Sequence, residues 1–181
     1  MRAQFDPISF QPILARRKTP FLVLSSSIVQ SSAEAFREFS PTIKTFYSVK
    51  ANTAPDLLRY MSGLDLGFEV SSRHELEVLL LLGIAPSRII TSNPVKAPQF
   101  IRYAYISGIR QYAFDSVHEA DKIAALAPQS DVVVRMHTDN SESQWPLEGK
   151  YGVEPDDALA LLSYAADLQL CPVGLTFHVG S

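Results

Sequence analysis

The regular alternation of strand-like and helix-like segments limits the fold of this chain more than any other feature of its sequence. Short apolar segments rich in β-branched and aromatic residues recur, and helix-like segments separate them. Strands are predicted at residues 45–51, 66–72, 88–94, 110–116, 131–137 and 173–181. Because strands that alternate with helices form right-handed βαβ units, this order predicts a parallel sheet.

Proline and glycine mark the ends of the predicted helices. Pro55, Pro98 and Pro155 stand where a helix begins, and Gly83 and Gly108 stand where one ends. Helices are therefore predicted over residues 55–62, 73–82, 98–107, 117–127 and 155–168. Ahead of this alternating region, residues 19–25 are a further strand candidate and residues 28–39 are a helix candidate.

The number of predicted strands bears on the fold class. A (β/α)8 TIM-type barrel typically has eight strands and ~250 residues, whereas the alternating part of this 181-residue sequence holds six predicted strands. A dinucleotide-binding open sheet is less favoured, because no glycine fingerprint follows the first strand. We therefore expect an α/β chain that forms an incomplete barrel, with about six of the eight strands.

The composition argues against several classes of protein. Hydrophobic residues make up 46% and charged residues 19% of the chain, and the net charge is -3 without a long run of one sign. These values argue against nucleic acid or an anionic membrane as the main partner. Residues 1–18 lack the order of a signal peptide, and the single cysteine, Cys171, cannot form an internal disulfide. We expect a cytoplasmic protein, with Cys171 buried as a small apolar residue beside a strand.

Charged residues stand at or near the carboxyl ends of the predicted strands, where barrel enzymes hold their active groups. Lys50 ends the first strand, and a buried lysine can form a Schiff base, although an ordinary surface lysine is the alternative. Glu69 and Arg135 each lie in an apolar strand, so a buried ion pair between them is expected. His178 opens the sequence His-Val-Gly-Ser, which suits ring stacking and phosphate binding; a satisfied core histidine is the alternative.

Two common kinds of site find no support in the sequence. The four histidines show no metal-ligand spacing with the cysteine or with one another, which argues against a zinc site. No Gly-x-Ser-x-Gly motif is present, which argues against a hydrolase of the Ser/His/Asp type. The strand ends are therefore the segments in which we expect the chemistry.

The strand-end segments, taken in order, resemble one protein family. The matching segments are TPFLVLS, FYSVKAN, LGFEVSSRHEL, RIITSNPVK, YAFDS, VVVRM, WPLEGKYG and FHVGS. This set is similar to the ornithine/diaminopimelate/arginine decarboxylases that depend on pyridoxal phosphate (PLP) and have an alanine-racemase-like barrel. The likeness runs from about residue 19 to residue 181. WPLEGKYG looks most like the ornithine decarboxylases of bacterial type, because diaminopimelate decarboxylases usually carry Asn-Pro where Met136-His137 stand here.

The resemblance implies a role for each matching residue. Lys50 matches the lysine that forms the Schiff base with PLP, and His178 matches the histidine that stacks on the pyridine ring, so both are expected to be catalytic. Ser181 matches a serine that contacts the cofactor phosphate. Glu69 stands where the family commonly has aspartate, and Lys150 matches a lysine that faces the partner subunit of a homodimer. The expected cofactor-binding residues are Lys50, Glu69, Glu75, Arg135, His178 and Ser181.

The resemblance also implies an activity, which is the decarboxylation of a basic amino acid. L-Ornithine, which would give putrescine for polyamine biosynthesis, is the first choice, and lysine, arginine or diaminopimelate are alternatives. A non-catalytic relative that only binds a partner is a second class of function, although the presence of Lys50, His178 and Ser181 argues against it. An amino-acid racemase on the same barrel is a third, and the FHVGS and SNP segments favour the decarboxylases over it.

The resemblance divides the chain near residue 26. Residues 1–26 are expected to pack against the C-terminal β-domain of the family, and residues 27–181 are expected to form part of the PLP-binding barrel. In the family, the glycine-rich phosphate loop, the acidic residue at the pyridine nitrogen and the β-domain all follow the matched region. We therefore expect this chain alone to be inactive.

Overall fold

The computed structural model describes residues 11–18, 20–39, 42–144 and 149–180. The chain divides into two compact units, Met1–Thr45 and Phe46–Ser181. The boundary expected near residue 26 from the family resemblance stays a prediction. Within the described ranges, no helix has both the length and the apolar character needed to cross a membrane.

The described part of the first unit contains two helices, α1 (Gln11–Leu14) and α2 (Ser26–Phe39). The helix predicted over residues 28–39 is confirmed within α2. The strand predicted over residues 19–25 is wrong, because residues 21–25 have no regular structure. A strand without a neighbour leaves its backbone N–H and C=O groups unpaired, and the described residues of this unit offer it no neighbouring strand.

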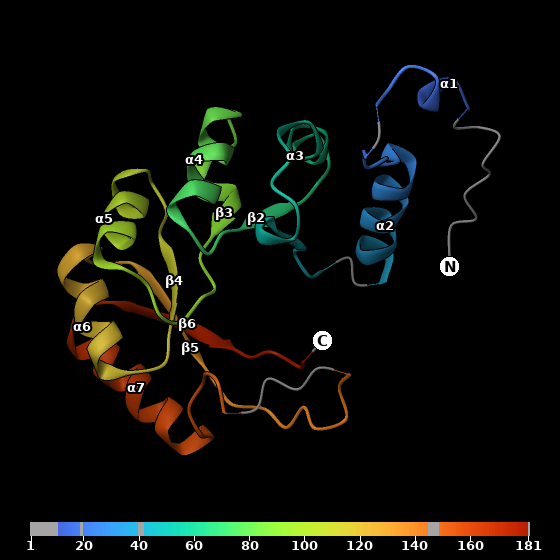
Figure 1. Ribbon diagram of the computed structural model, residues 1–181. Coiled ribbons are helices and arrows are strands. Elements are labelled where there is room, and N and C mark those ends of the chain that lie inside the picture. Colours follow the sequence, from blue (N-terminus) through green and yellow to red (C-terminus); the bar gives the residue numbers. More distant parts are fainter. Residues whose placement is uncertain (1–10, 19, 40–41, 145–148, 181) are drawn as a thin grey trace. The chain divides into compact units, whose positions relative to one another are not determined.

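The described residues of the second unit form six parallel strands. They are β1 (Phe46–Ser48), β2 (Gly67–Glu69), β3 (Ile89–Ile90), β4 (Gln111–Phe114), β5 (Asp131–Arg135) and β6 (Cys171–Thr176). The pairing orders are β1-β2-β3 and β4-β5-β6, and a parallel bridge between Thr91 and Tyr112 joins the two sets. Each strand therefore lies beside its neighbour in sequence (Figure 1). This is the strand order of a barrel wall, but these strands do not close a barrel.

All six described strands end earlier than the sequence predicts, and in β1 and β6 the change falls at a candidate site residue. β1 stops at Ser48, and Val49–Ala51 form a 3-10 turn, so Lys50 lies in this turn rather than in the strand. β6 stops at Thr176, so His178 lies beyond the strand. Both residues therefore lie on loops at strand ends, where active groups of this class of fold are usually held.

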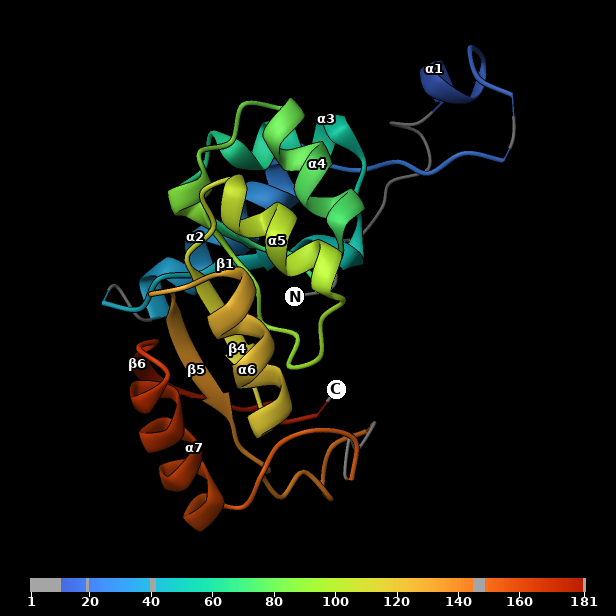
Figure 2. The same ribbon diagram turned by 90° about the vertical axis from the view of Figure 1, so that its left-hand side faces the viewer.

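Helices connect the strands at the places that proline and glycine predict. They are α3 (Pro55–Ser62), α4 (Arg73–Leu81), α5 (Pro98–Ile106), α6 (Val117–Leu126) and α7 (Pro155–Asp167). α4 contacts α5, α5 contacts α6, and α6 contacts α7, while α6 packs on β4 and α7 packs on β5 and β6. Figure 2 shows these four helices following one another along the strands. The helices cover one side of the sheet and leave the carboxyl ends of the strands to the loops.

Serine residues cap the first turns of α4 and α6. The Ser72 hydroxyl accepts a hydrogen bond from Glu75 N, and the Ser116 hydroxyl accepts one from Glu119 N, each at 3.3 Å. Both pairs have the Ser-x-x-Glu spacing of a capping box. The two caps hold the helices directly after the ends of β2 and β4, and so they help to fix the loops that carry polar side chains.

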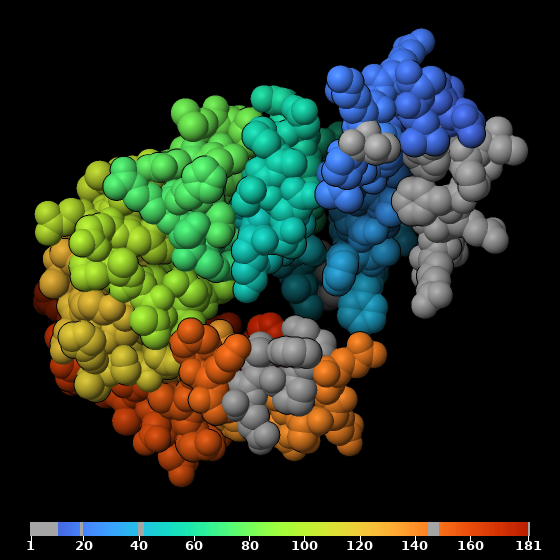
Figure 3. Space-filling model, in the orientation of Figure 1, coloured from blue at the N-terminus to red at the C-terminus, as the bar shows by residue number. Residues whose placement is uncertain are grey.

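The core lies between the strands and this helix layer. Its largest fully buried side chains come from both layers and include Phe68, Tyr112, Phe114, Leu76, Leu79, Ile101 and Ile123. Outside this core, the side chains of α4, α5 and α6 form a continuous surface, coloured green to yellow in Figure 3. Fully burying one such side chain contributes about 1.5–3 kcal/mol.

β6 is more exposed than the other strands of its set. Within the described residues it pairs with β5 alone, and its first three residues are exposed. The expectation that Cys171 is buried is therefore wrong, because its side chain lies on a strand with a neighbour on one side only. Its thiol donates a weak hydrogen bond to the carbonyl oxygen of Gln129, at 3.8 Å.

A buried group of charges links the end of β3 to α6. Lys96 Nζ lies 3.0 Å from Glu119 Oε1, and these side chains are only 0% and 3% exposed. Glu119 also pairs with Lys122, and Lys96 Nζ donates to the carbonyl oxygens of Asn93 and Ala113. Burial lowers the pKa of Lys96 to about 8, an effect that the attraction of Glu119 partly offsets.

Replacing Glu119 should destabilise the fold far more than replacing the acid of an exposed ion pair. Glu119→Gln leaves the buried Lys96 amine without its counter-ion, which should cost about 3–5 kcal/mol of unfolding free energy. Glu77→Gln is the control, because Glu77 pairs with Arg73 at 2.7 Å where the side chains are 36% and 58% exposed; it should cost under about 1 kcal/mol. Urea unfolding measures both, and equal losses would contradict the assigned role of the buried pair.

Candidate cofactor site

Glu69 lies at the end of β2 and joins the ends of two strands. The parallel register places Ser48 opposite Glu69. The Ser48 hydroxyl donates to Glu69 Oε2 at 2.7 Å, and the Ser71 hydroxyl donates to Glu69 Oε1 at 2.9 Å. Glu69 is buried, and among the described residues two hydroxyl groups, not a cation, satisfy its carboxylate oxygens. The predicted Glu69–Arg135 ion pair is not formed.

Glu75 extends this network into α4. Its Oε2 accepts a hydrogen bond of 2.8 Å from the backbone N–H of Ser71. Because the hydroxyl of the same serine bonds Glu69, the two carboxylates hold Ser71 from two sides. Glu75 therefore acts on the site through Ser71, and its placement follows from the cap of α4.

Lys50 projects from the 3-10 turn that follows β1. The preceding residue, Val49, is fully buried and anchors the turn, whereas Lys50 is exposed. Within the described part of the chain, the Lys50 amine forms no hydrogen bond or ion pair. Lys50 thus places a primary amine at a strand end, on a turn that the buried Val49 anchors.

Arg135 ends β5, and its side chain lies against an aromatic ring. The guanidinium carbon lies 5.3 Å from the centre of the Tyr151 ring, within the range of a cation–π contact. Arg135 Nε is buried and has no hydrogen-bond partner among the described residues. An unpaired buried donor is costly, so this N–H is a group that a bound anion or acceptor could satisfy.

His178 is held by its own backbone and by a neighbouring loop. The backbone N–H of Gly180 donates to His178 Nδ1 at 2.9 Å, and the Thr138 hydroxyl donates to the carbonyl oxygen of His178 at 2.9 Å. The pKa of His178 is lowered, first by partial burial and then by the charges of Arg135 and Lys50. The ring is therefore neutral at neutral pH, and because Nδ1 accepts a hydrogen bond, its proton is assigned to Nε2.

The predicted site residues that the structure describes fall into two groups. Lys50 and Arg135 both act on His178, although the three residues come from the ends of β1, β5 and β6. Glu69 and Glu75 form a separate hydrogen-bonded group at the ends of β1 and β2. Ser181, the predicted phosphate contact, lies outside the described residues.

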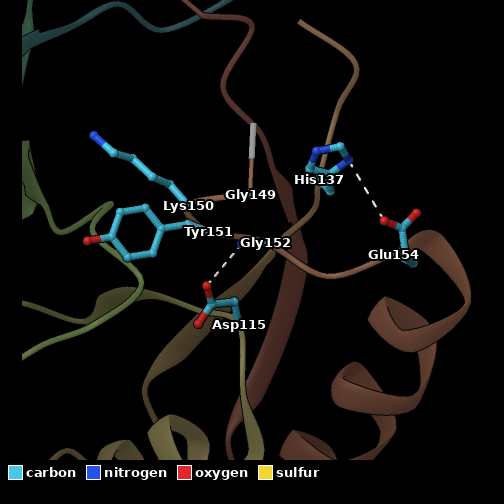
Figure 4. Close-up of a pocket in the computed structure, with 7 residues that line it drawn as sticks. All are labelled: Asp115, His137, Gly149, Lys150, Tyr151, Gly152 and Glu154. Atoms are coloured by element: carbon cyan, nitrogen blue, oxygen red, sulfur yellow. Dashed lines mark hydrogen bonds and ion pairs between the residues drawn. The ribbon is translucent and has the colours of Figure 1, made fainter. Parts of the chain in front are cut away.

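A polar pocket of about 500 Å³ lies beyond the ends of β4 and β5 (Figure 4). Its lining residues are Asp115, His137, Gly149, Lys150, Tyr151, Gly152 and Glu154. Asp115 Oδ2 accepts a 3.0 Å hydrogen bond from Gly152 N, and His137 Nδ1 lies 3.8 Å from Glu154 Oε1. Gly152 has φ +100°, and a Cβ there would lie 2.7 Å from His137 N. Lys150 is exposed at this pocket.

Asp115 and Gly152 were not among the residues predicted for the site. Asp115 was detectable, since it directly follows a predicted strand. Gly152 could not be predicted from local sequence, because its role depends on a hydrogen bond to Asp115, which lies 37 positions earlier.

Removing the charge of Arg135 should raise the pKa of His178 toward its ordinary value. A nearby cation lowers the pKa of His178 because it disfavours the imidazolium form. Arg135→Met removes this contribution, while the contributions of burial and of Lys50 remain. Arg135→Lys keeps the positive charge and should leave the pKa lowered. An NMR titration of the His178 ring, assigned with His178→Gln, measures the shift. An unchanged pKa in Arg135→Met would contradict this arrangement of charges.

Known proteins are similar to this chain in both sequence and fold. Residues 26–181 match the family described as pyridoxal-dependent decarboxylase, pyridoxal binding domain. The lysine/ornithine decarboxylase of Selenomonas ruminantium is 38% identical over 169 residues, which are 93% of this chain and 43% of that protein. The ornithine decarboxylase of Schizosaccharomyces pombe is 40% identical over 141 residues, which are 78% of this chain and 33% of that protein.

A crystal structure of lysine decarboxylase from Selenomonas ruminantium has a TM-score of 0.92 to this chain at 35% identity. The match covers 98% of this chain and 47% of that one. The chain therefore spans less than half the length of these relatives. The family resemblance of the strand-end segments is confirmed, and the chain belongs to the pyridoxal-binding domain family of the pyridoxal-dependent decarboxylases.

Proposed function

We propose that this chain forms the PLP-binding part of an enzyme that decarboxylates a basic amino acid. The observation that carries the proposal is the placement of Lys50, Arg135 and His178 at or just beyond the carboxyl ends of three parallel strands, in a chain of this family. A primary amine, a cation and a flat neutral ring are the groups that a phosphorylated aromatic aldehyde needs. We propose that the relatives' second half, which this chain does not span, completes the active site.

The residues present fit this cofactor. Lys50 offers an amine without a partner in the described structure, and Arg135 Nε is a buried donor without an acceptor. Gly180 has φ +87°, a conformation that favours glycine and lets backbone approach a ligand closely. We assign attachment of the aldehyde to Lys50 and stacking on the pyridine ring to His178. Phosphate contact is assigned to Ser181, on the family resemblance alone.

The proposed chemistry divides between the cofactor and the chain. When bound, PLP supplies an electron sink for the electron pair that remains when CO₂ leaves. The exposed Lys50 amine would serve as the point of attachment for the cofactor aldehyde. Glu69 accepts a hydrogen bond from Ser48, two residues before Lys50. This contact holds the turn from which the lysine side chain projects. The His178 ring, fixed at Nδ1, presents a neutral face.

We propose L-ornithine as the substrate and putrescine as the product. The 40% identity to an ornithine decarboxylase and the 38% identity to a lysine/ornithine decarboxylase support this choice. The test uses the product of the complete reading frame that contains this chain, assayed for CO₂ release from ornithine, lysine, arginine and diaminopimelate. A preference for lysine would overturn the choice of ornithine and leave the cofactor assignment standing. The 181-residue chain alone should release no CO₂ from any of the four.

Lys50 should be the residue that carries the cofactor. The chain is mixed with PLP and reduced with borohydride, which makes an imine bond permanent, and the labelled peptide is identified by mass spectrometry. Lys50→Arg should abolish the label because arginine keeps the charge but does not form the bond. Lys44→Ala should leave the label unchanged. A label that survives in Lys50→Arg would refute the assignment.

We also propose a homodimer in which Lys150 faces the partner subunit, as the family resemblance implies. Its exposure at the rim of the polar pocket supports this role (Figure 4). Lys150→Ala should raise the dimer dissociation constant, measured by sedimentation velocity, because a charged contact across the interface is lost. Arg102→Ala, at an exposed site on α5, is the control. A dissociation constant that Lys150→Ala does not raise would contradict the proposed contact.

A further inference from the structure

The segment that carries His178 leaves the sheet before it reaches the site. The β5–β6 ladder ends at the pair Arg135 and Thr176, and the last backbone bond there runs from Met136 N to the carbonyl oxygen of Thr176, at 2.8 Å. Residues 177–180 make no further ladder bonds with β5. Another contact must therefore fix the position of His178.

A loop that follows β5, residues 138–143, supplies such contacts. The Thr138 hydroxyl donates to the carbonyl oxygen of His178 at 2.9 Å, and Asn140 Nδ2 lies 3.5 Å from the same oxygen. These donors lie about 40 positions earlier in the sequence, so the contact depends on the tertiary fold. Side chains of the loop thus hold the segment that follows β6, beyond the point at which the backbone ladder ends.

Gly180 gives a second and independent sign that the loop packs against this segment. A Cβ at Gly180 would lie 2.2 Å from Ser143 Oγ and 2.5 Å from Ser143 Cβ, so no larger residue fits without movement. The backbone N–H of Gly180 is also the donor to His178 Nδ1. The position of the loop therefore decides where this N–H lies, and with it the orientation of the imidazole ring.

We propose that Thr138 is a positioning residue for His178, whose backbone it fixes so that the Gly180 N–H holds the imidazole at Nδ1. The importance of this for catalysis rests on the proposed function, whereas the positioning is a property of this chain alone. Arg135 and Lys50 are the charged groups that act on the ring in this position. A ring released from it would move away from both charges.

The test compares Thr138→Val with Thr138→Ser in the 181-residue chain. Valine has nearly the shape of threonine but lacks the hydroxyl, and serine keeps the hydroxyl. Thr138→Val should raise the NMR-measured pKa of His178 toward its ordinary value and shift the Gly180 amide signal, and Thr138→Ser should match the unmodified chain. In a PLP titration, Thr138→Val should weaken binding about tenfold, the effect of one hydrogen bond of ordinary strength.

A second variant changes the packing of the same loop against Gly180. Gly180→Ala places a methyl group against Ser143 and should shift the His178 pKa in the same direction. Unchanged amide signals of β4 and β5 show that each variant is folded. An unaltered His178 titration in either variant overturns the inference, whatever the cofactor does. If the unmodified chain takes up no PLP on Lys50, the proposed function fails, and the titration still decides the role of Thr138.

Discussion

The parallel pairing of consecutive strands is the constraint on which the rest of the second unit depends. Each strand lies beside the next one in sequence, so all the carboxyl ends meet at one edge. Lys50, Arg135 and His178 are far apart in the chain, yet they lie at or just beyond the ends of parallel strands that follow one another in order. Their electrostatic coupling is thus a consequence of strand direction and order, since antiparallel neighbours would send alternate ends to opposite edges.

The buried side chains of Glu119 and Glu69 are satisfied by two different kinds of partner. Glu119 meets Lys96 and Lys122, so its charge is balanced by cations in the interior. Glu69 accepts hydrogen bonds from the hydroxyls of Ser48 and Ser71. The first arrangement ties a loop to a helix in the folded core, where an unpaired charge is costly. The second places a hydrogen-bonded carboxylate at a strand end.

Several features were predictable because they depend on residues close in sequence. Pro98 and Pro155 begin helices and Gly83 and Gly108 follow helices, since a ring-locked φ suits the first turn and a positive φ suits glycine. Ser72 caps α4 for the same local reason. Lys50 and His178 could be placed near strand ends from hydrophobic patterns alone. The exact ends of β1 and β6 could not, because a strand stops where its partner no longer offers hydrogen bonds.

The sequence by itself determined the alternation of strands and helices, the family of the chain and the identity of the strand-end residues. All of these follow from local patterns and from motifs kept in order. Only the tertiary structure decided that Glu69 bonds two serines instead of Arg135, that Cys171 is exposed, and that Thr138 reaches His178. Each of these outcomes depends on which side chains of distant segments come within a few ångströms of each other, and that distance is fixed by strand register and loop path rather than by any local pattern.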